Sequence, residues 1–83
     1  MTVDILFFGK VADKAGIRQL KMELSDTGGS LLALRDKALG TVFAAGGLDA
    51  TQVQMSVNQV RVTGDMPLSD GDEVAFFSAF SGG

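Results

Sequence analysis

The chain has 83 residues, 46% of them hydrophobic and 20% charged, which gives one globular domain and excludes a second. It contains neither cysteine nor histidine, which excludes a disulfide framework, Cys/His zinc sites and the commonest catalytic nucleophile and base. The net charge of −3 argues against a nucleic-acid partner, because the seven basic residues are scattered from Lys10 to Arg61, and a protein partner with a basic surface fits this charge better.

The first predicted element is a strand over residues 2–8, TVDILFF. One face alternates three apolar residues, as in a half-buried strand: Val3, Ile5 and Phe7. The other face carries Leu6 and Phe8 and is not polar either. The strand is therefore either covered on both sides or presents Phe8 to a partner.

The next segment, GKVADKAG over residues 9–16, is predicted as a short connection with one helical turn. The strand IRQLKMEL follows over residues 17–24 and alternates three inward apolar residues with polar ones: Leu20, Met22 and Leu24. We expect this strand to run antiparallel to the first.

A turn, SDTGGS over residues 25–30, leads into the one predicted helix. The helix has apolar residues at helical spacing, Leu31, Leu34 and Ala38 among them. Ser30 is placed to cap its N-terminus, and Gly40 stands where a left-handed glycine would end it, so the helix has about ten residues. The segment TVFAAGGLDATQ, residues 41–52, is predicted as a loop with a short turn around Phe43.

Three strands complete the pattern. Residues 53–60 alternate apolar and polar side chains, Asn58 and Gln59 turn the chain, and residues 60–62 form a short returning strand. Residues 63–73 are rich in turn signals. The last strand, EVAFFSAF, is predicted over residues 73–80, and we assign residues 78–83 to a flexible C-terminal tail that overlaps its end.

The order of these elements indicates the fold. Two hairpin-connected strands, one helix that covers the sheet and a long return strand make an α+β fold with a mixed sheet. Right-handed crossover places the last strand beside the first, parallel to it and central. This is the ubiquitin-like β-grasp arrangement, in a single domain over residues 1–83.

Two turn motifs have a plain structural interpretation that we favour over a ligand site. SDGDE, residues 69–73, lacks the spacing of a calcium loop, so a solvated turn with local Asp-to-backbone hydrogen bonds is favoured. TGGS, residues 27–30, matches no phosphate-binding fingerprint, so ordinary helix capping is favoured. We predict no metal site. Met22, Met55 and Met66 are interpreted as gap-filling residues.

Phe76 and Phe77 are adjacent in the last strand, so their side chains leave by opposite faces. Phe76 is in register with Val74 and is assigned to the core. Phe77 then lies on the other face beside Phe8 of the neighbouring strand, where an aromatic pair is typical of a partner surface. The alternative is that the protein's own loops cover both faces.

The chain ends on Gly82 and Gly83, which add nothing to a core. Two residues without Cβ can pass through a channel too narrow for side chains and deliver the terminal carboxylate to another protein's active site. This carboxylate is the remaining reactive group, and it needs activation, typically as an acyl-adenylate.

The whole chain resembles the small subunits of molybdopterin synthase, the MoaD-like sulfur carriers of molybdenum cofactor synthesis. The resemblance rests on ILFFGKVADKAG, LLALRDKAL, VNQ and above all PLSDGDEVAFFSAFSGG. In such proteins, the resemblance implies, a MoeB-like activating enzyme uses ATP to adenylate the terminal carboxylate, which becomes a thiocarboxylate. The carrier then docks into a MoaE-like large subunit, in a heterotetramer, and its sulfur passes to cyclic pyranopterin monophosphate.

The resemblance also implies roles for individual residues. Gly83 would be the thiocarboxylated residue, with Gly82 and Ser81 threaded beside it, and Phe8, Phe77 and Phe80 would face partners. The chain itself would bind no cofactor and act as a carrier subunit without catalytic side chains of its own. It departs from relatives in its pre-tail, which lacks proline, and at Ala12, where some relatives have a basic residue.

Two alternatives remain open. A carrier for thiazole or tRNA thiolation shares the glycine tail, although length and DGDEVAFF favour the molybdenum branch. A ubiquitin-like interaction module, with an idle tail, belongs to a different class.

Overall fold

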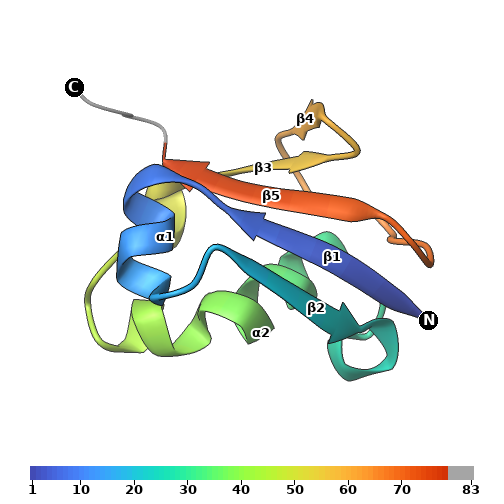
Figure 1. Cartoon of the computed structure of the whole chain (residues 1–83), viewed down its shortest axis with the longest axis horizontal. Coiled ribbons are helices and arrows are strands. Elements are labelled where there is room, and N and C mark those ends of the chain that lie inside the picture. Colours follow the sequence, from blue (N-terminus) through green and yellow to red (C-terminus); the bar gives the residue numbers. More distant parts are fainter. Residues whose placement is uncertain (79–83) are drawn as a thin grey trace.

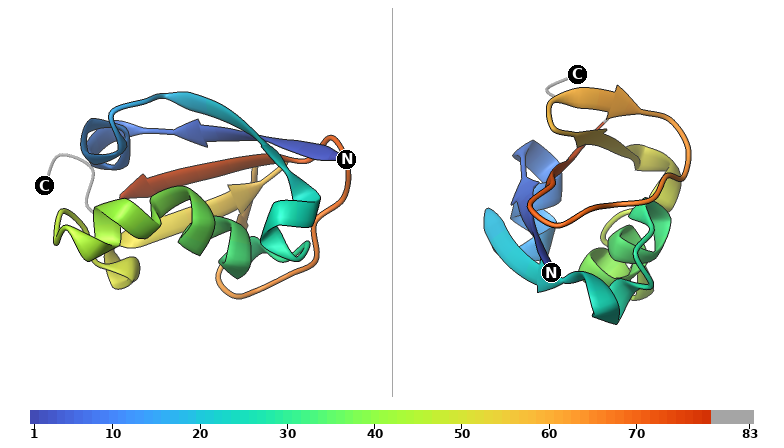
Figure 2. Two further views of the ribbon diagram at one scale, coloured as in Figure 1. Left: turned by 90° about the horizontal axis from the view of Figure 1, so that it is seen from below. Right: turned by 90° about the vertical axis from the view of Figure 1, so that its right-hand side faces the viewer.

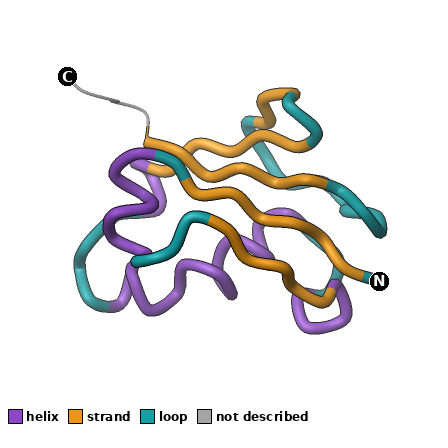
Figure 3. The backbone as a smooth tube through the Cα atoms, viewed as in Figure 1, coloured by secondary structure: helices purple, strands orange, loops and turns teal. Residues whose placement is uncertain are grey.

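The computed structural model describes residues 1–78, apart from the side chains of residues 26 and 27. Within these residues, five strands form one mixed sheet in the order β2-β1-β5-β3-β4 (Figures 1 and 3). The strands are β1 (Thr2–Phe7), β2 (Gln19–Glu23), β3 (Val53–Val57), β4 (Val60–Val62) and β5 (Glu73–Ser78). β1 and β5 run parallel inside the sheet, and each other neighbouring pair is antiparallel.

The helix α2 (Leu31–Ala44) crosses one face of this sheet, while the opposite face carries no helix in the part of the chain described (Figure 2). The last strand lies beside the first and parallel to it, as the crossover rule predicts. The predicted β-grasp arrangement is therefore confirmed. Within residues 1–78, no helix is both long and apolar enough to cross a membrane.

The core lies between the sheet and α2. Apart from Val11, its largest fully buried side chains come from the inward positions of β1 and β5 and from one side of α2: Val3, Ile5, Val74, Phe76, Leu31, Leu34 and Leu39. The Phe7 and Phe76 rings pack against each other at 6.0 Å between centroids. The alternation of apolar residues in the sequence thus identified the buried face of both strands correctly.

The first connection is more helical than predicted. α1 (Gly9–Ala15) has seven residues and ends at Gly16, which takes a left-handed conformation with φ 78°. Val11 is fully buried, and Ala12 and Ala15 pack against the core. This burial stabilises a helix longer than the one turn that the sequence predicted.

The prediction that α2 stops at Gly40 was wrong. The helix has fourteen residues and continues to Ala44, because Val42 and Phe43 pack against the core. A glycine inside a helix costs about 1 kcal/mol relative to alanine, and the partial burial of Val42 and Phe43 against the core offsets this cost. The predicted loop over residues 41–52 therefore begins as helix, and it ends in the 3-10 helix η2 (Ala50–Gln52).

The N-terminus of α2 has two caps. Ser30 Oγ accepts the Ala33 N–H at 3.1 Å, as predicted. Asp65, far along the chain, adds a carboxylate that accepts the Leu32 N–H at 2.9 Å. Beside it, the Leu31 N–H donates to the Met66 carbonyl at 2.9 Å, so the loop after β4 is held against the helix start. The 3-10 helix η1 (Leu24–Thr27) precedes this junction.

Candidate docking surface

The face of the sheet without a helix carries an apolar patch at its centre. Leu6 of β1 pairs with Ala75 of β5 on this face, and Phe77 follows two residues later on the same side. We call Leu6, Ala75, Phe77 and Phe8 the sheet-face patch. It exists because β1 and β5 have apolar residues on both faces, whereas β2 alternates Gln19, Lys21 and Glu23 outward.

Phe8 lies on this face because the chain stays extended for one residue beyond β1. Its backbone has φ −126° and ψ 149°, and its N–H donates to the Phe76 carbonyl at 3.1 Å. The alternation of β1 therefore continues, with Phe7 inward and Phe8 outward. Phe8, which directly follows the central strand β1, is 50% exposed, an unusual degree for a phenylalanine.

Phe76 and Phe77 take the opposite faces that the sequence predicted. Phe76 is fully buried, and Phe77 is only partly covered. The alternative, in which loops of the protein cover both faces, does not hold for Phe8. The role of Phe8 and Phe77 in binding a partner stays a prediction.

Charged side chains surround the patch on the β2 side. Lys21 Nζ lies 3.7 Å from Asp4 Oδ1, and both residues are on the exposed strand faces. The α-amino group of Met1 donates to Glu23 Oε1 at 2.9 Å. This hydrogen bond, together with the charge of Glu23, raises the pKa of the Met1 amino group.

The turn before β5 is built by its acidic residues. Asp72 Oδ2 accepts the Ser69 N–H at 2.8 Å, and its Oδ1 accepts the Asn58 side-chain amide at 3.0 Å. The Ser69 N–H, and then the Asn58 amide, lower the pKa of the Asp72 carboxyl. The Glu73 N–H donates to Asn58 Oδ1 at 3.0 Å, so Asn58 ties the β3–β4 hairpin to the start of β5.

This network confirms the interpretation of SDGDE as a hydrogen-bonded turn, with one addition. Asp70 Oδ1 accepts the N–H of Thr2, a residue at the other end of the chain, at 2.8 Å. Among residues 1–78, no three or more acidic side chains come together as metal ligands. Ordinary capping by Ser30 likewise confirms the interpretation of TGGS.

The predicted tail lies largely outside the described residues. Ser78 belongs to β5, where it pairs with Val53, at the end of the sheet where α1 lies (Figure 1). Phe80, Ser81, Gly82 and Gly83 are beyond the part of the chain that the structure describes. Their roles stay predictions.

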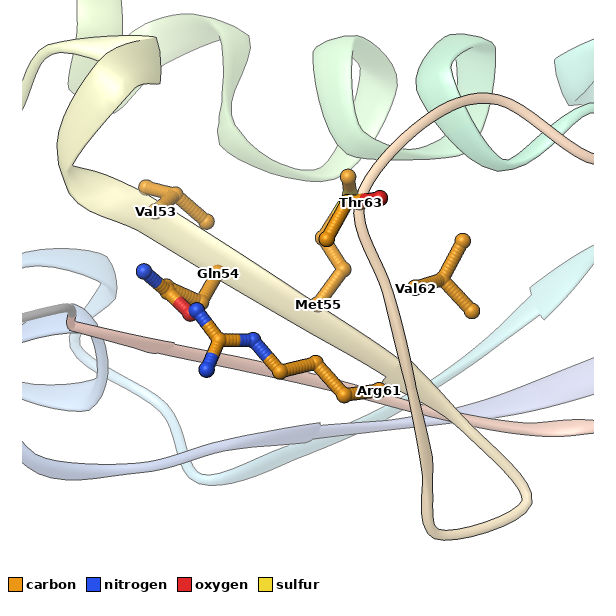
Figure 4. Close-up of a pocket in the computed structure, with 6 residues that line it drawn as sticks. All are labelled: Val53, Gln54, Met55, Arg61, Val62 and Thr63. Atoms are coloured by element: carbon orange, nitrogen blue, oxygen red, sulfur yellow. The ribbon is translucent and has the colours of Figure 1, made fainter.

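One feature of this surface was missed by sequence reasoning. Arg61 of β4 pairs with Ser56, which pairs with Ala75, so Arg61 lies on the same face as the sheet-face patch. It borders a groove of about 210 Å³ lined also by Gln54 and Thr63 (Figure 4). The hairpin turn at residues 58–59 fixes this register, and that turn was predicted, so the signal was present in the sequence.

Comparison with known protein families identifies the family of this chain. The ThiS family model matches residues 5–83 of the chain. The chain belongs to the ThiS family. It therefore has the fold of ubiquitin-like sulfur carriers, a family of proteins that work with partner enzymes. No curated protein matches this ThiS-family chain.

Solved structures share the fold of this ThiS-family chain at low sequence identity. SAMP1 from Haloferax volcanii has a TM-score of 0.76 at 20% identity, with both chains fully covered. The "Putative molybdopterin converting factor, subunit 1" from Pyrococcus furiosus also has a TM-score of 0.76, at 22% identity over 96% of this chain and 99% of that one. The small archaeal modifier protein 1 from Methanosarcina acetivorans has a TM-score of 0.72 at 16% identity, over 99% of this chain and 96% of that one.

Proposed function

We propose that this chain is the sulfur-carrier subunit of a molybdopterin synthase. In this proposal the reactive group is the α-carboxylate of Gly83, and the folded domain brings it to partner enzymes by docking. The observation that carries the proposal is the position of the sheet-face patch in a ThiS-family domain. The patch lies on β1 and β5, and β5 is the strand that leads toward the Gly-Gly sequence.

The proposed chemistry starts on an adenylating enzyme. The Gly83 carboxylate attacks the α-phosphorus of ATP, pyrophosphate leaves, and the acyl-adenylate forms. Sulfide then attacks the activated carbonyl carbon and AMP leaves, which gives a thiocarboxylate. ATP belongs to the enzyme in this scheme, and the carrier binds no cofactor.

The next steps take place on a large subunit. The carrier docks there as part of a heterotetramer, and the thiocarboxylate sulfur bonds to a carbon of cyclic pyranopterin monophosphate. Water then breaks the bond between this sulfur and the Gly83 carbonyl carbon, which restores the carboxylate and leaves the sulfur on the pterin. Gly82 and Gly83 suit this task because a segment without side chains fits a narrow channel. Ordering each tail residue costs about 1–2 kcal/mol, and docking of Phe8, Phe77 and Phe80 would offset that cost.

The molybdenum branch is favoured by the PLSDGDEVAFFSAFSGG sequence and by the name of the Pyrococcus furiosus protein of the same fold. Carriers for thiazole or tRNA thiolation would use the same tail chemistry with other partners. An interaction module with an idle tail would not gain sulfur at all.

The test has two stages. The full chain is incubated with the adenylating enzyme of its own organism, ATP and sulfide, and its intact mass is measured. We expect a gain equal to the replacement of one oxygen by sulfur, and none without ATP. The product is then mixed with the large subunit and cyclic pyranopterin monophosphate. Formation of molybdopterin supports the proposal, whereas sulfur gain without molybdopterin contradicts the assigned branch.

A further inference from the structure

Of the two cations that the strands carry on the helix-free face, within residues 1–78, Arg61 is the one without an ion-pair partner. Lys21, the other cation of that face, pairs with Asp4 at 3.7 Å. The register fixes the position of Arg61. It pairs with Ser56, which pairs with Ala75, which in turn pairs with Leu6, so these four residues form one row of cross-strand partners. It is therefore at the edge of the sheet-face patch, on the β4 side.

The side chain of Arg61 extends along β3, so that its guanidinium lies beside Gln54 (Figure 4). Gln54 is the cross-strand partner of Phe77. The backbone of Arg61 is therefore level with Ala75, but its charged group is level with Phe77, nearer the end of the sheet where β5 finishes. A protein that covers Phe77 would also reach this guanidinium.

The carboxylates of the same face either lie far from the Arg61 guanidinium or already bind another group of the chain. Glu23 accepts a hydrogen bond from the Met1 amino group at 2.9 Å. Glu73 lies in the row of Asp4, toward the start of β5, whereas the guanidinium of Arg61 points the other way. Since an arginine stays charged at any physiological pH, this cation is available to a group from outside the chain.

The groove beside Arg61 indicates what that group is. Three of its lining residues are apolar, and three carry polar groups: Val53, Met55 and Val62, then Gln54, Arg61 and Thr63. An acidic side chain fits such a lining, because its methylene groups contact apolar surface while its carboxylate takes two hydrogen bonds from the guanidinium.

A free small ligand fits less well. The groove has about 210 Å³, below the 300–1,000 Å³ of typical ligand pockets. Arg61 is also the only cation that lines it, within the described residues, and one open-sided cation is a weak site for a multiply charged phosphate.

We propose that Arg61 is a specificity-determining residue that binds an Asp or Glu side chain of the protein docked on the sheet-face patch. This inference rests on the proposed function, in which both the adenylating enzyme and the large subunit dock on the patch, and it concerns the adenylating enzyme. The overall charge of −3 suggested a partner with a basic surface. At the patch itself, Arg61 instead selects for a local acidic group, and a neutral or basic residue there would be rejected.

The experiment measures binding of the full chain to the adenylating enzyme, without ATP, for Arg61→Glu, Arg61→Gln and Arg61→Lys. We expect Arg61→Glu to raise Kd about tenfold or more, because it places like charges together in the interface. Arg61→Lys keeps the charge and loses the planar fork, so a smaller rise of about threefold is expected. Lys37→Glu, on the exposed side of α2, changes the net charge equally and should stay within about twofold.

Charge reversal on the enzyme identifies the partner group. Acidic residues around its docking site are changed to Lys one at a time, and one of them should restore binding to Arg61→Glu. Thermal melting checks that each variant is folded. If Arg61→Glu does not fold, the binding of Arg61→Gln is compared with that of the wild type instead.

The outcomes separate the two proposals. If Arg61→Glu binds as tightly as the wild type while the wild type gains sulfur, this inference is wrong and the proposed function stands. If the effect appears only with ATP present, Arg61 contacts nucleotide phosphate and the inference is also wrong. If the wild-type chain neither binds the enzyme nor gains sulfur, the proposed function itself fails.

Discussion

Phe76 and Phe77 are consecutive residues of β5 that lie on opposite faces of the sheet. Phe76 is fully buried and packs its ring 6.0 Å from that of Phe7, whereas Phe77 is partly exposed beside Phe8. One strand thus supplies both an anchor of the core and a member of the sheet-face patch.

This relationship predicts that the two phenylalanines differ in what they stabilise. Phe76→Ala should lower the free energy of unfolding by about 3–5 kcal/mol, because it leaves a cavity in the core. Phe77→Ala should cost less than about 1.5 kcal/mol, since Phe77 is only partly buried and leaves no closed cavity, but should weaken binding to the adenylating enzyme. Denaturant unfolding and a binding titration measure both effects. A core-sized loss of stability in Phe77→Ala would contradict the assignment.

Gly40 predicts a gain of stability. It lies inside α2, and a Cβ built on it meets no atom within 4 Å. Gly40→Ala should therefore raise the free energy of unfolding by about 0.5–1 kcal/mol, because alanine loses less backbone entropy in a helix. Gly16 is the matched control, since it also has open space but has φ 78°. Gly16→Ala should destabilise the fold by about 1 kcal/mol or more. Equal effects of both changes would show that α2 is not helical at Gly40.

The Asp65 cap stabilises the start of α2, so its removal should lower the stability of the fold. Asp65→Ala removes the acceptor of the Leu32 N–H and should lower the free energy of unfolding by about 0.5–2 kcal/mol. Ser30→Ala, which removes the acceptor of the Ala33 N–H, should cost a similar amount. Thermal and denaturant unfolding of the single and double variants measure these costs. An Asp65→Ala variant as stable as the wild type would mean that the loop after β4 does not cap the helix.

Asp72 predicts a pH dependence. Its folded pKa lies below its ordinary value of about 3.9, so the carboxylate form stabilises the fold above that pH. This contribution is lost as the pH falls from about 4 through the folded pKa. Asp72→Asn should flatten the stability curve in this acidic range, while the wild type loses stability there. Because Asp72 is partly exposed, the effect should shrink with added salt. Parallel curves for the two proteins would contradict it.

Period-two alternation predicted most of the sheet. The inward positions of β1 and β5, the turn at residues 58–59 and the parallel central pair were all confirmed. These features depend on neighbours in sequence and on general rules of chain connection, so the sequence carries them directly.

Features that depend on distant contacts were not predicted. The length of α2 beyond Gly40 depends on burial of Val42 and Phe43, and local glycine signals point the other way. The second cap of α2 comes from Asp65, which is separated from Leu32 by 33 residues. Neither relationship has a signature within a short window of sequence.

The candidate site falls between these cases. The placement of Phe8 and Phe77 on one face followed from alternation once β1 and β5 were placed side by side. Arg61 escaped notice because its place at the patch needs the register of three strands at once, from Arg61 through Ser56 to Ala75. Its reach toward Gln54 also depends on a side-chain conformation that no sequence pattern encodes.

In the proposed function, the reactive group of this protein is the α-carboxylate of Gly83. The most direct test is the rate of sulfur transfer to cyclic pyranopterin monophosphate by a variant extended by one residue that the partner enzymes cannot remove. Unfolding and binding through the sheet-face patch should match the wild type, while sulfur transfer is abolished. Sulfur transfer at the wild-type rate from the extended chain would contradict the claim.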